Sequence, residues 1–154
     1  MLLFRLETQL PSEMTELRQW VNWRYELRKG HATKVPYNAQ TLKRASTTKP
    51  ATWSTYAHAV SRVTDKTGLG FVLIPPWIGV DLDHCVSEEG TFSLMARQIV
   101  ARFSTTYIEY SPSGTGIHLF LKGVLEKAIK TPLGEVYTTG RYFTVTGRRV
   151  EGLS

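Results

Sequence analysis

Residues 77–83 read Trp77-Ile78-Gly79-Val80-Asp81-Leu82-Asp83, an apolar run that ends in two carboxylates separated by one residue. A short apolar run of this kind predicts a buried strand. Successive side chains of a strand point to opposite faces, so Asp81 and Asp83 are expected to project from the same face. Neighbouring carboxylates repel each other unless a positive charge separates them, and a divalent cation bound through oxygen is a common solution. Alternatively, Asp81 caps a turn and Asp83 merely ends the strand.

The segments on either side of this strand predict an alternation of helices and strands. Strands are expected at 21–28, 70–74, 107–110 and 117–122, and those at 135–138 and 142–146 flank the turn Thr139-Gly140. Short helices are expected from about Ser12, which can cap the first of them, and after Ser54. The clearest helix is predicted by apolar residues at helical spacing, namely Phe92, Met95, Ala96, Ile99 and Phe103. This interleaving predicts an α+β domain built on one mixed or antiparallel sheet.

Length and charge together indicate one domain with a basic N-terminal segment. The 154 residues are 42% hydrophobic and 21% charged, which is typical of a single globular domain over residues 1–154. Residues 18–49 contain eight Lys and Arg against one acidic residue, Glu26, whereas the remainder has eleven against twelve. Such a segment suits a polyanion, although a solvated basic face without a partner is the alternative. Residues 29–50 are predicted as a long, turn-rich connection.

The single cysteine and the N-terminal stretch exclude several classes of protein. Cys85 alone cannot form an internal disulfide or a CxxC pair, so we expect no zinc site and a reducing, cytoplasmic setting. The stretch MLLFRLETQL at 1–10 is interrupted by Arg5 and Glu7 and lacks a small-residue cleavage site, so it predicts neither a signal peptide nor a membrane span. No other window approaches the ~18 apolar residues of a spanning helix. A soluble protein without membrane contact is expected.

A turn-forming run precedes a histidine at 111–118, which reads Ser111-Pro112-Ser113-Gly114-Thr115-Gly116-Ile117-His118. Two glycines and three hydroxyls suit a loop that offers backbone N–H groups to a phosphate, and His118 follows on the emerging strand. The glycine-and-lysine pattern of a Walker A loop is absent from the chain. A tight hairpin needs Gly114 or Gly116 in any case, and a single histidine is more often structural than catalytic.

Glu135 begins the predicted strand at 135–138, and it becomes a candidate site residue only together with the other polar candidates. With Asp81, Asp83, His118 and the basic segment, it suggests a two-metal nucleotidyl-transfer or nuclease site. In such a site the cations activate the attacking oxygen and stabilise the leaving pyrophosphate. Composition and spacing do not distinguish synthesis from hydrolysis.

Eight segments occur in an order that is more specific than any single motif. They are residues 20–23, 34–38, 44–47, 52–54, 68–73, 79–85, 111–118 and 140–147. Together they resemble the primase-polymerase domain of phage and plasmid replication proteins, within the archaeo-eukaryotic primase superfamily. This resemblance implies an RRM-like sheet that carries the motifs at 79–147, packed with a smaller N-terminal α/β unit.

The resemblance also implies roles for individual residues. Asp81 and Asp83 match the DxD motif that binds the catalytic Mg²⁺ or Mn²⁺ ions, and Glu135 matches the third acidic metal ligand. His118 matches the histidine that contacts the phosphates of the incoming nucleotide. The wider superfamily often has SxH at this motif, whereas this chain has Gly116 two residues before the histidine. We interpret this as a difference of the phage and plasmid branch.

Physical reasoning adds four candidates. Arg141 is expected near Glu135 across a hairpin turn, where it would neutralise phosphate or template charge, and Tyr142 is expected against the nucleotide sugar. Lys34 and Arg44 are expected to contact the DNA backbone. The tryptophans are expected in the core rather than as base-stacking platforms, and they are Trp20, Trp23 and Trp53.

These features favour a template-dependent nucleotidyltransferase, a DNA primase or DNA-directed DNA polymerase in phage, plasmid or mobile-element replication. Its expected partners are a single-stranded DNA template or primer and dNTP or NTP, in the cytoplasm of a bacterial, archaeal or phage-infected cell. The alternative is a non-catalytic single-stranded-DNA-binding module of a replication initiator. Related domains commonly continue into a helical region and a helicase, so we expect such a domain or partner outside this chain.

Overall fold

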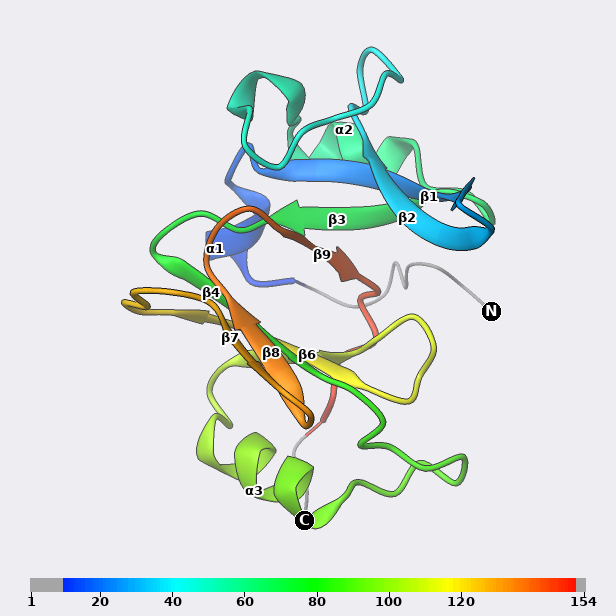
Figure 1. Ribbon diagram of the computed structural model, residues 1–154. Coiled ribbons are helices and arrows are strands. Elements are labelled where there is room, and N and C mark those ends of the chain that lie inside the picture. Colours follow the sequence, from blue (N-terminus) through cyan, green and yellow to red (C-terminus); the bar gives the residue numbers. More distant parts are fainter. Residues whose placement is uncertain (1–9, 152–154) are drawn as a thin grey trace.

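The structure is a computed structural model that describes residues 10–151 and has an α+β fold with two antiparallel sheets (Figure 1). The predicted fold class is therefore confirmed. The prediction that residues 1–10 form neither a signal peptide nor a membrane span concerns, apart from Leu10, residues outside the described range. Within residues 10–151, no helix is long and apolar enough to cross a membrane.

Nine strands and three α-helices make up the described part of the chain. The strands are β1 (Trp20–Arg28), β2 (His31–Tyr37), β3 (Gly68–Val72), β4 (Trp77–Leu82), β5 (Tyr107–Tyr110), β6 (Ile117–Lys122), β7 (Ile129–Thr131), β8 (Gly134–Tyr137) and β9 (Tyr142–Val145). The helices are α1 (Ser12–Thr15), α2 (Tyr56–Ser61) and α3 (Leu94–Arg102), with a 3₁₀ turn η1 (Pro50–Thr52). The first sheet has the order β2-β1-β3-β9 and the second β5-β6-β4-β8-β7.

Four predictions about individual elements are wrong. The chain forms two sheets rather than one, and β8 and β9 do not pair as a hairpin, because β8 joins β4 while β9 crosses to β3. The basic stretch 29–50 is not a continuous connection, because its first part is strand β2, paired with β1 through the tight turn Lys29-Gly30. Ser12 does not cap α1; it is the first helical residue and Pro11 precedes it.

The two sheets pack face to face through aromatic side chains. Trp20, Phe71 and Phe143 of the first sheet share one core with Trp77 and Phe120 of the second. The ring of Phe71 lies 5.4 Å from that of Trp77 and 6.2 Å from that of Phe120, between ring centroids. Such edge-to-face contacts fix how the sheets lie on each other in addition to burying apolar area. All three predicted core tryptophans are buried, which confirms that expectation.

Helix α3 covers the other face of the second sheet (Figure 1). Its apolar spacing buries Ala96 and Val100 against Ile108 and Leu119, and the Ser93 hydroxyl caps its first turn by accepting from the Ala96 N–H. The face of the second sheet that lies toward the first sheet is therefore the one left to carry the site.

Gly79 allows the two sheets to approach closely beside Asp81. A Cβ atom at this position would lie 2.7 Å from the Leu73 side chain and 2.7 Å from the Phe143 ring. Both neighbours are buried, so neither can move aside freely. The missing side chain of Gly79 thus sets the position of Phe143 over β4.

We expect Gly79→Ala to lower the free energy of unfolding by about 1–3 kcal/mol, because the added methyl group overpacks this contact. Urea unfolding measures the change. Gly123→Ala is the matched control, since its Cβ would meet only the end of the Ile78 side chain, at 3.2 Å. Equal effects of the two substitutions would contradict the close sheet contact at Gly79.

Candidate active site

One cross-strand row of the second sheet contains five titratable side chains. Asp81 of the central strand β4 lies opposite His118 of β6 on one side and Glu135 of β8 on the other. Glu109 of β5 lies opposite His118, and Lys130 of β7 lies opposite Glu135. Directly opposed residues project from the same face of a sheet. The row therefore brings together three of the predicted site residues, from segments far apart in the sequence.

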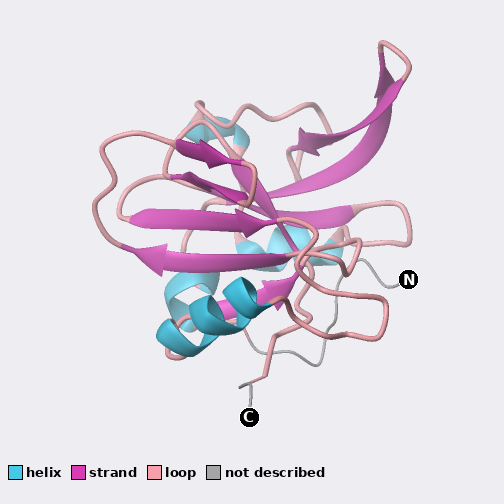
Figure 2. Ribbon diagram, turned by 60° about the horizontal axis from the view of Figure 1, so that its bottom comes forward, coloured by secondary structure: helices cyan, strands magenta, loops and turns pink. Residues whose placement is uncertain are grey.

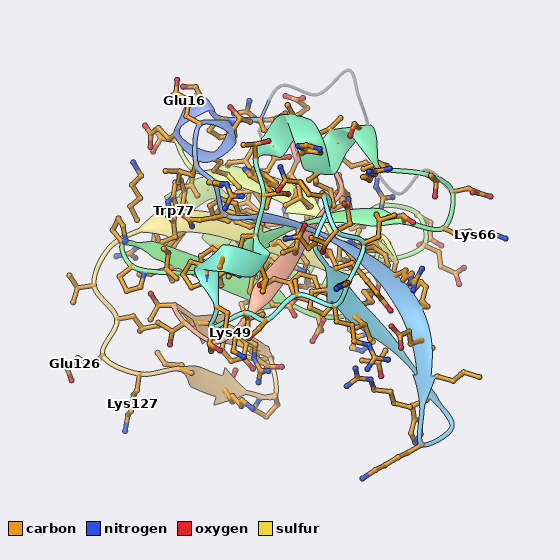
Figure 3. All side chains as sticks on the ribbon, turned by 90° about the horizontal axis from the view of Figure 1, so that it is seen from above. Glu16, Lys49, Lys66, Trp77, Glu126 and Lys127 are labelled. Carbon is orange, nitrogen blue, oxygen red and sulfur yellow. The ribbon has the colours of Figure 1, made fainter. Side chains whose placement is uncertain are left out.

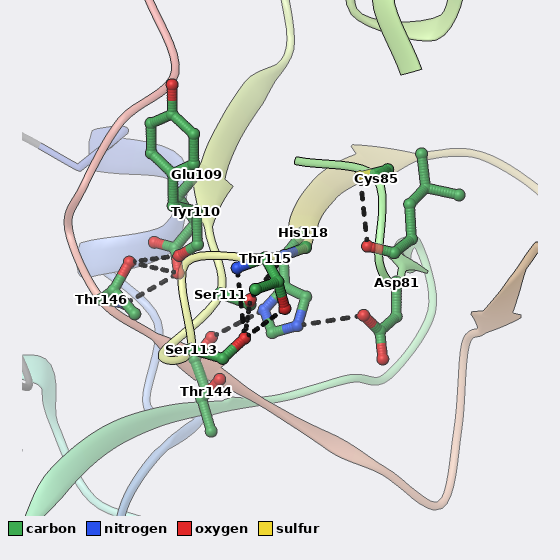
Figure 4. Close-up of polar contacts among 12 residues, drawn as sticks. Asp81, Cys85, Glu109, Tyr110, Ser111, Ser113, Thr115, His118, Thr144 and Thr146 are labelled. Carbon is green, nitrogen blue, oxygen red and sulfur yellow. Dashed lines mark hydrogen bonds and ion pairs between the residues drawn. The ribbon is translucent and has the colours of Figure 1, made fainter. Parts of the chain in front are cut away.

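His118 is held at both ring nitrogens (Figure 4). Its Nε2 lies 3.3 Å from Asp81 Oδ1, and its Nδ1 lies 3.2 Å from the Thr144 carbonyl oxygen. A carbonyl oxygen only accepts, so Nδ1 carries a proton. Burial disfavours the charged ring, but the Asp81 hydrogen bond and charge, the charge of Glu109 and the Thr144 carbonyl outweigh it and raise the pKa of His118.

Glu109 is a buried carboxylate that the sequence analysis did not single out. It is fully buried, and it accepts hydrogen bonds from the Thr146 N–H at 2.7 Å, the Tyr107 hydroxyl at 2.9 Å and the Gly147 N–H at 3.2 Å. Burial raises the pKa of Glu109, while the positive charge of His118 and these hydrogen bonds oppose the rise. Glu109 thereby ties the segment after β9 to β5.

The remaining two carboxylates lie at the more open end of the row. Asp83 follows the last residue of β4 and is exposed, and the Tyr137 hydroxyl donates to the Glu135 carboxylate. Residual burial, and then the negative charges of Asp81 and Glu135, raise the pKa of Asp83, whereas His118 lowers it. The negative charges of the three carboxylates are close enough to influence one another.

The donor chemistry of these carboxylates suits a hard divalent cation. Asp81, Asp83 and Glu135 supply only oxygen atoms, which Mg²⁺ and Mn²⁺ prefer. A cation would also relieve the repulsion that, after burial, contributes to the raised pKa of Asp83. Across residues 10–151, however, no three or more His, Cys, Asp or Glu side chains are arranged as a metal site. Asp81 contacts His118 and Glu135 contacts Tyr137 instead. A two-metal role for the three carboxylates stays a prediction.

A cleft of about 820 Å³ lies over the row, between residues of both sheets. Asp81, His118 and Glu135 line it from the second sheet, and the loop at 44–47, which follows β2, lines it from the side of the first sheet. Its cationic lining residues are Arg28, Lys34, Arg44, Lys130 and Arg141. A carboxylate floor with cationic walls suits a ligand that carries both phosphates and metal ions.

Arg141 does not lie across a hairpin turn from Glu135; Tyr137 lies between the two residues. Its guanidinium lies 4.7 Å from the centre of the Tyr137 ring, whose hydroxyl donates to Glu135. The predicted proximity of Arg141 to the site therefore holds, but the geometry that was expected to cause it is wrong, because β8 and β9 belong to different sheets. Tyr142 also lines the cleft, and its hydroxyl donates to the Lys34 carbonyl oxygen.

The two residues predicted to contact the DNA backbone, Lys34 and Arg44, both line the cleft but have different neighbours. Lys34 lies 5.9 Å from the Trp23 ring centre and 5.6 Å from that of Tyr25. Arg44 donates to the Glu26 carboxylate at 2.5 Å. A salt bridge at an exposed position is weak, so Arg44 remains available for a phosphate.

The loop at 111–116 is folded upon itself. The Gly114 N–H donates to the Ser111 carbonyl, the Thr115 N–H to the Ser113 hydroxyl and the Gly116 N–H to the Ser111 hydroxyl. These amides are satisfied within the loop, so a phosphate role for the loop stays a prediction. Ser111 and Ser113 line a second cavity of about 380 Å³ together with Asp81, Asp83 and His118.

Several residues of the site escaped the sequence analysis. They are Glu109, Lys130, Tyr137, Thr144 and Arg148. The Arg148 guanidinium donates to the Ser111 carbonyl at 2.6 Å and so stabilises the loop at 111–116. Glu109 did carry a signal, because a carboxylate inside the strand Tyr107-Ile108-Glu109-Tyr110 is surrounded by apolar residues. Lys130 carried none, since its three-residue strand is polar and exposed.

Comparison with known proteins supports the predicted resemblance. No protein-family model matches the sequence. An alignment over 151 residues, at 36% identity, relates the chain to a protein from Nitratiruptor phage NrS-1 that is named DNA Primase-polymerase. The chain is homologous to this phage primase-polymerase. The alignment covers 90% of the chain but 20% of the primase-polymerase, so the chain spans about a fifth of the length of its relative.

Glu109→Ala is expected to lower the free energy of unfolding by about 2–4 kcal/mol, because it leaves two buried backbone N–H groups without an acceptor. Glu109→Gln, which keeps one acceptor oxygen, should cost about half as much. Thermal and urea unfolding measure both, with the exposed Glu88→Ala as control. Losses below about 0.5 kcal/mol for both Glu109 variants would contradict the anchoring role of Glu109.

Proposed function

We propose that this chain is a nucleotidyltransferase domain that synthesises or extends a primer on a single-stranded DNA template. The observation that carries the proposal is the row of Asp81, His118 and Glu135 at the floor of a cleft with cationic walls. The homology to a protein named DNA Primase-polymerase supports the same class of activity. The substrates would be a DNA primer or template and dNTP or NTP.

Asp81, Asp83 and Glu135 are the residues that would hold two Mg²⁺ or Mn²⁺ ions. The chemistry that these ions supply is activation of the attacking hydroxyl and neutralisation of charge on the leaving pyrophosphate. The carboxylates contribute by concentrating negative charge on one face of β4 and β8. Burial is the main cause of the raised pKa of Asp83, and the negative charges of Asp81 and Glu135 add to it. A bound cation would be favoured by these negative charges on electrostatic grounds.

His118 would orient the triphosphate of the incoming nucleotide. Its raised pKa favours the protonated ring, in which both nitrogens donate. The Nδ1 proton is held by the Thr144 carbonyl, so the ring cannot turn without losing that bond. The proton on Nε2 then lies on the side of Asp81 and the cleft, where a phosphate oxygen can accept it.

The cationic walls of the cleft would bind the remaining phosphate charge. Arg141 and Lys130 lie on the side of Glu135, and Lys34 and Arg44 lie on the side of the first sheet. Cations distributed on both walls can bind a triphosphate and a template strand at the same time. A helicase or helical accessory domain, expected from the resemblance, would supply functions outside this chain.

A primer-extension assay with isosteric variants tests the proposal. Asp81→Asn and Glu135→Gln remove one charge each without changing size, and we expect each to lower the rate of synthesis at least about 100-fold, because each removes charge at the reacting centre. The assay uses primed and unprimed single-stranded templates, dNTPs and NTPs, and Mg²⁺ or Mn²⁺. Asp65→Asn, at an exposed residue that does not line the cleft, is the matched control.

Two results would contradict the proposal. The first is full synthesis by Asp81→Asn or Glu135→Gln. The second is the absence of synthesis by the unaltered chain when it still binds DNA, which would favour a non-catalytic single-stranded-DNA-binding module.

A further inference from the structure

The outer half of the β1–β2 hairpin, residues 24–33, projects from the body of the molecule and is here named the arm. Figures 2 and 3 show it as a curved two-stranded ribbon that leaves the rest of the structure at one side. Leu27 pairs with Ala32 and Arg28 with His31. Every residue of the arm is exposed except the half-buried Glu26. The arm is thus exposed on both faces, which is unusual for a strand pair.

The arm gains little stability from the rest of the chain. Two-stranded ribbons are marginally stable by themselves and normally depend on an apolar face that packs on a core. Here the core packing ends at Trp23, while Tyr25 is 55% exposed and Leu27 is 79% exposed. Packing on the core therefore does not explain the length of the arm, whereas contact with a binding partner does.

The charge of the arm identifies the chemistry of that partner. The arm contains three cations, Arg24, Arg28 and Lys29, and one acidic residue, Glu26, and a fourth cation, Lys34, follows it directly. The Glu26 carboxylate is already used, because Arg44 and the Tyr37 hydroxyl both donate to it. The arm therefore presents positive charge without compensation, which suits a polyanion.

The position of the arm connects it with the active-site cleft. Arg28 and Lys34 line the large cleft, and Lys34 also lines the smaller cavity beside Asp83. The cations thus continue from the reacting end of the cleft outward along the ribbon. A nucleic acid whose end lies at Asp81 would follow this path as it leaves the site.

The side chains of the arm favour a double helix over a single strand. Proteins that bind single strands combine cations with several aromatic platforms on which bases stack. Tyr25 is the one exposed aromatic residue between residues 10 and 151, and Lys34 lies 5.6 Å from its ring centre. Cations without stacking platforms are suited to the phosphate backbones of a duplex.

We propose that the arm binds the phosphate backbone of the primer–template duplex as the duplex leaves the cleft. The identity of this duplex rests on the function proposed above, whereas binding of duplex DNA by the arm does not. The cations at the tip, Arg28 and Lys29, would contact phosphates, and Leu27 would pack against the sugar–phosphate surface.

Salt-dependent DNA binding tests the proposal without any need for catalysis. Dissociation constants are measured by fluorescence anisotropy for a primer–template duplex and for a single strand of equal length, from 50 to 200 mM NaCl as an approximate range. Nucleotide and divalent cations are left out. The variant Arg28→Gln/Lys29→Gln is compared with Lys66→Gln/Lys127→Gln, which removes the same charge elsewhere on the surface (Figure 3).

The arm variant should weaken duplex binding at least about tenfold at about 100 mM salt and reduce the slope of log K against log salt by about 2, since each phosphate contact contributes about 0.9. The control variant should change neither quantity appreciably. The arm variant should lose clearly less affinity for the single strand than for the duplex, although Arg28 also lines the cleft. Circular dichroism and thermal unfolding establish that both variants fold.

Three results would overturn the proposal. The first is duplex binding by the arm variant equal to that of the control. The second is an equal loss of affinity for duplex and single strand, which would make the arm a single-strand path. The third is a dimer in sedimentation that Leu27→Asp dissociates while duplex binding is unchanged, which would make the arm a contact between copies. Arm-dependent duplex binding by a chain that synthesises no DNA would instead contradict the proposed function and leave the arm proposal intact.

Discussion

The contact between the buried His118 and the half-buried Asp81 sets the register of β6 on which the site depends. His118 lies between two carboxylates, Asp81 and Glu109, in one row of the sheet. A shift of β6 by one residue would move His118 to the face covered by α3 and leave both carboxylates without the imidazole ring between them. Burying an unpaired charge costs several kcal/mol, so this pairing excludes the neighbouring registers. The pairing of β8 with the other edge of β4 places Glu135 beside Asp81.

Strand β9 connects the two sheets and thereby forms the cleft between them. After β8 the chain leaves the second sheet and pairs with β3, and it then returns to Glu109 through Thr146. The crossing brings the Thr144 carbonyl to His118 and the Phe143 ring to 4.9 Å from the His118 ring, between centroids. The basic N-terminal unit is consequently fixed opposite the carboxylates, although the two are distant in sequence.

Local sequence patterns predicted most individual strands and helices, but they did not predict which sheet each strand joins. The strand that carries Asp81 and ends at Leu82, the helix buried at Ala96 and the strand that carries His118 were predicted, because periodicity indicates burial. No local signal tells β9 to join β3 rather than β8, since that choice depends on the packing of Phe143 on Gly79. Strand β2 was missed because Lys34, Pro36 and other polar or turn-forming residues dominate it.

The proposed function requires that Asp81, Asp83 and Glu135 hold the divalent cations in a cleft that binds a nucleoside triphosphate. It is tested most directly by anomalous X-ray diffraction from crystals grown with Mn²⁺ and a non-hydrolysable dNTP. We expect two manganese peaks within coordination distance of these carboxylates, with the triphosphate beside His118 and Arg141. Manganese bound elsewhere, or a nucleotide outside the cleft, would contradict it.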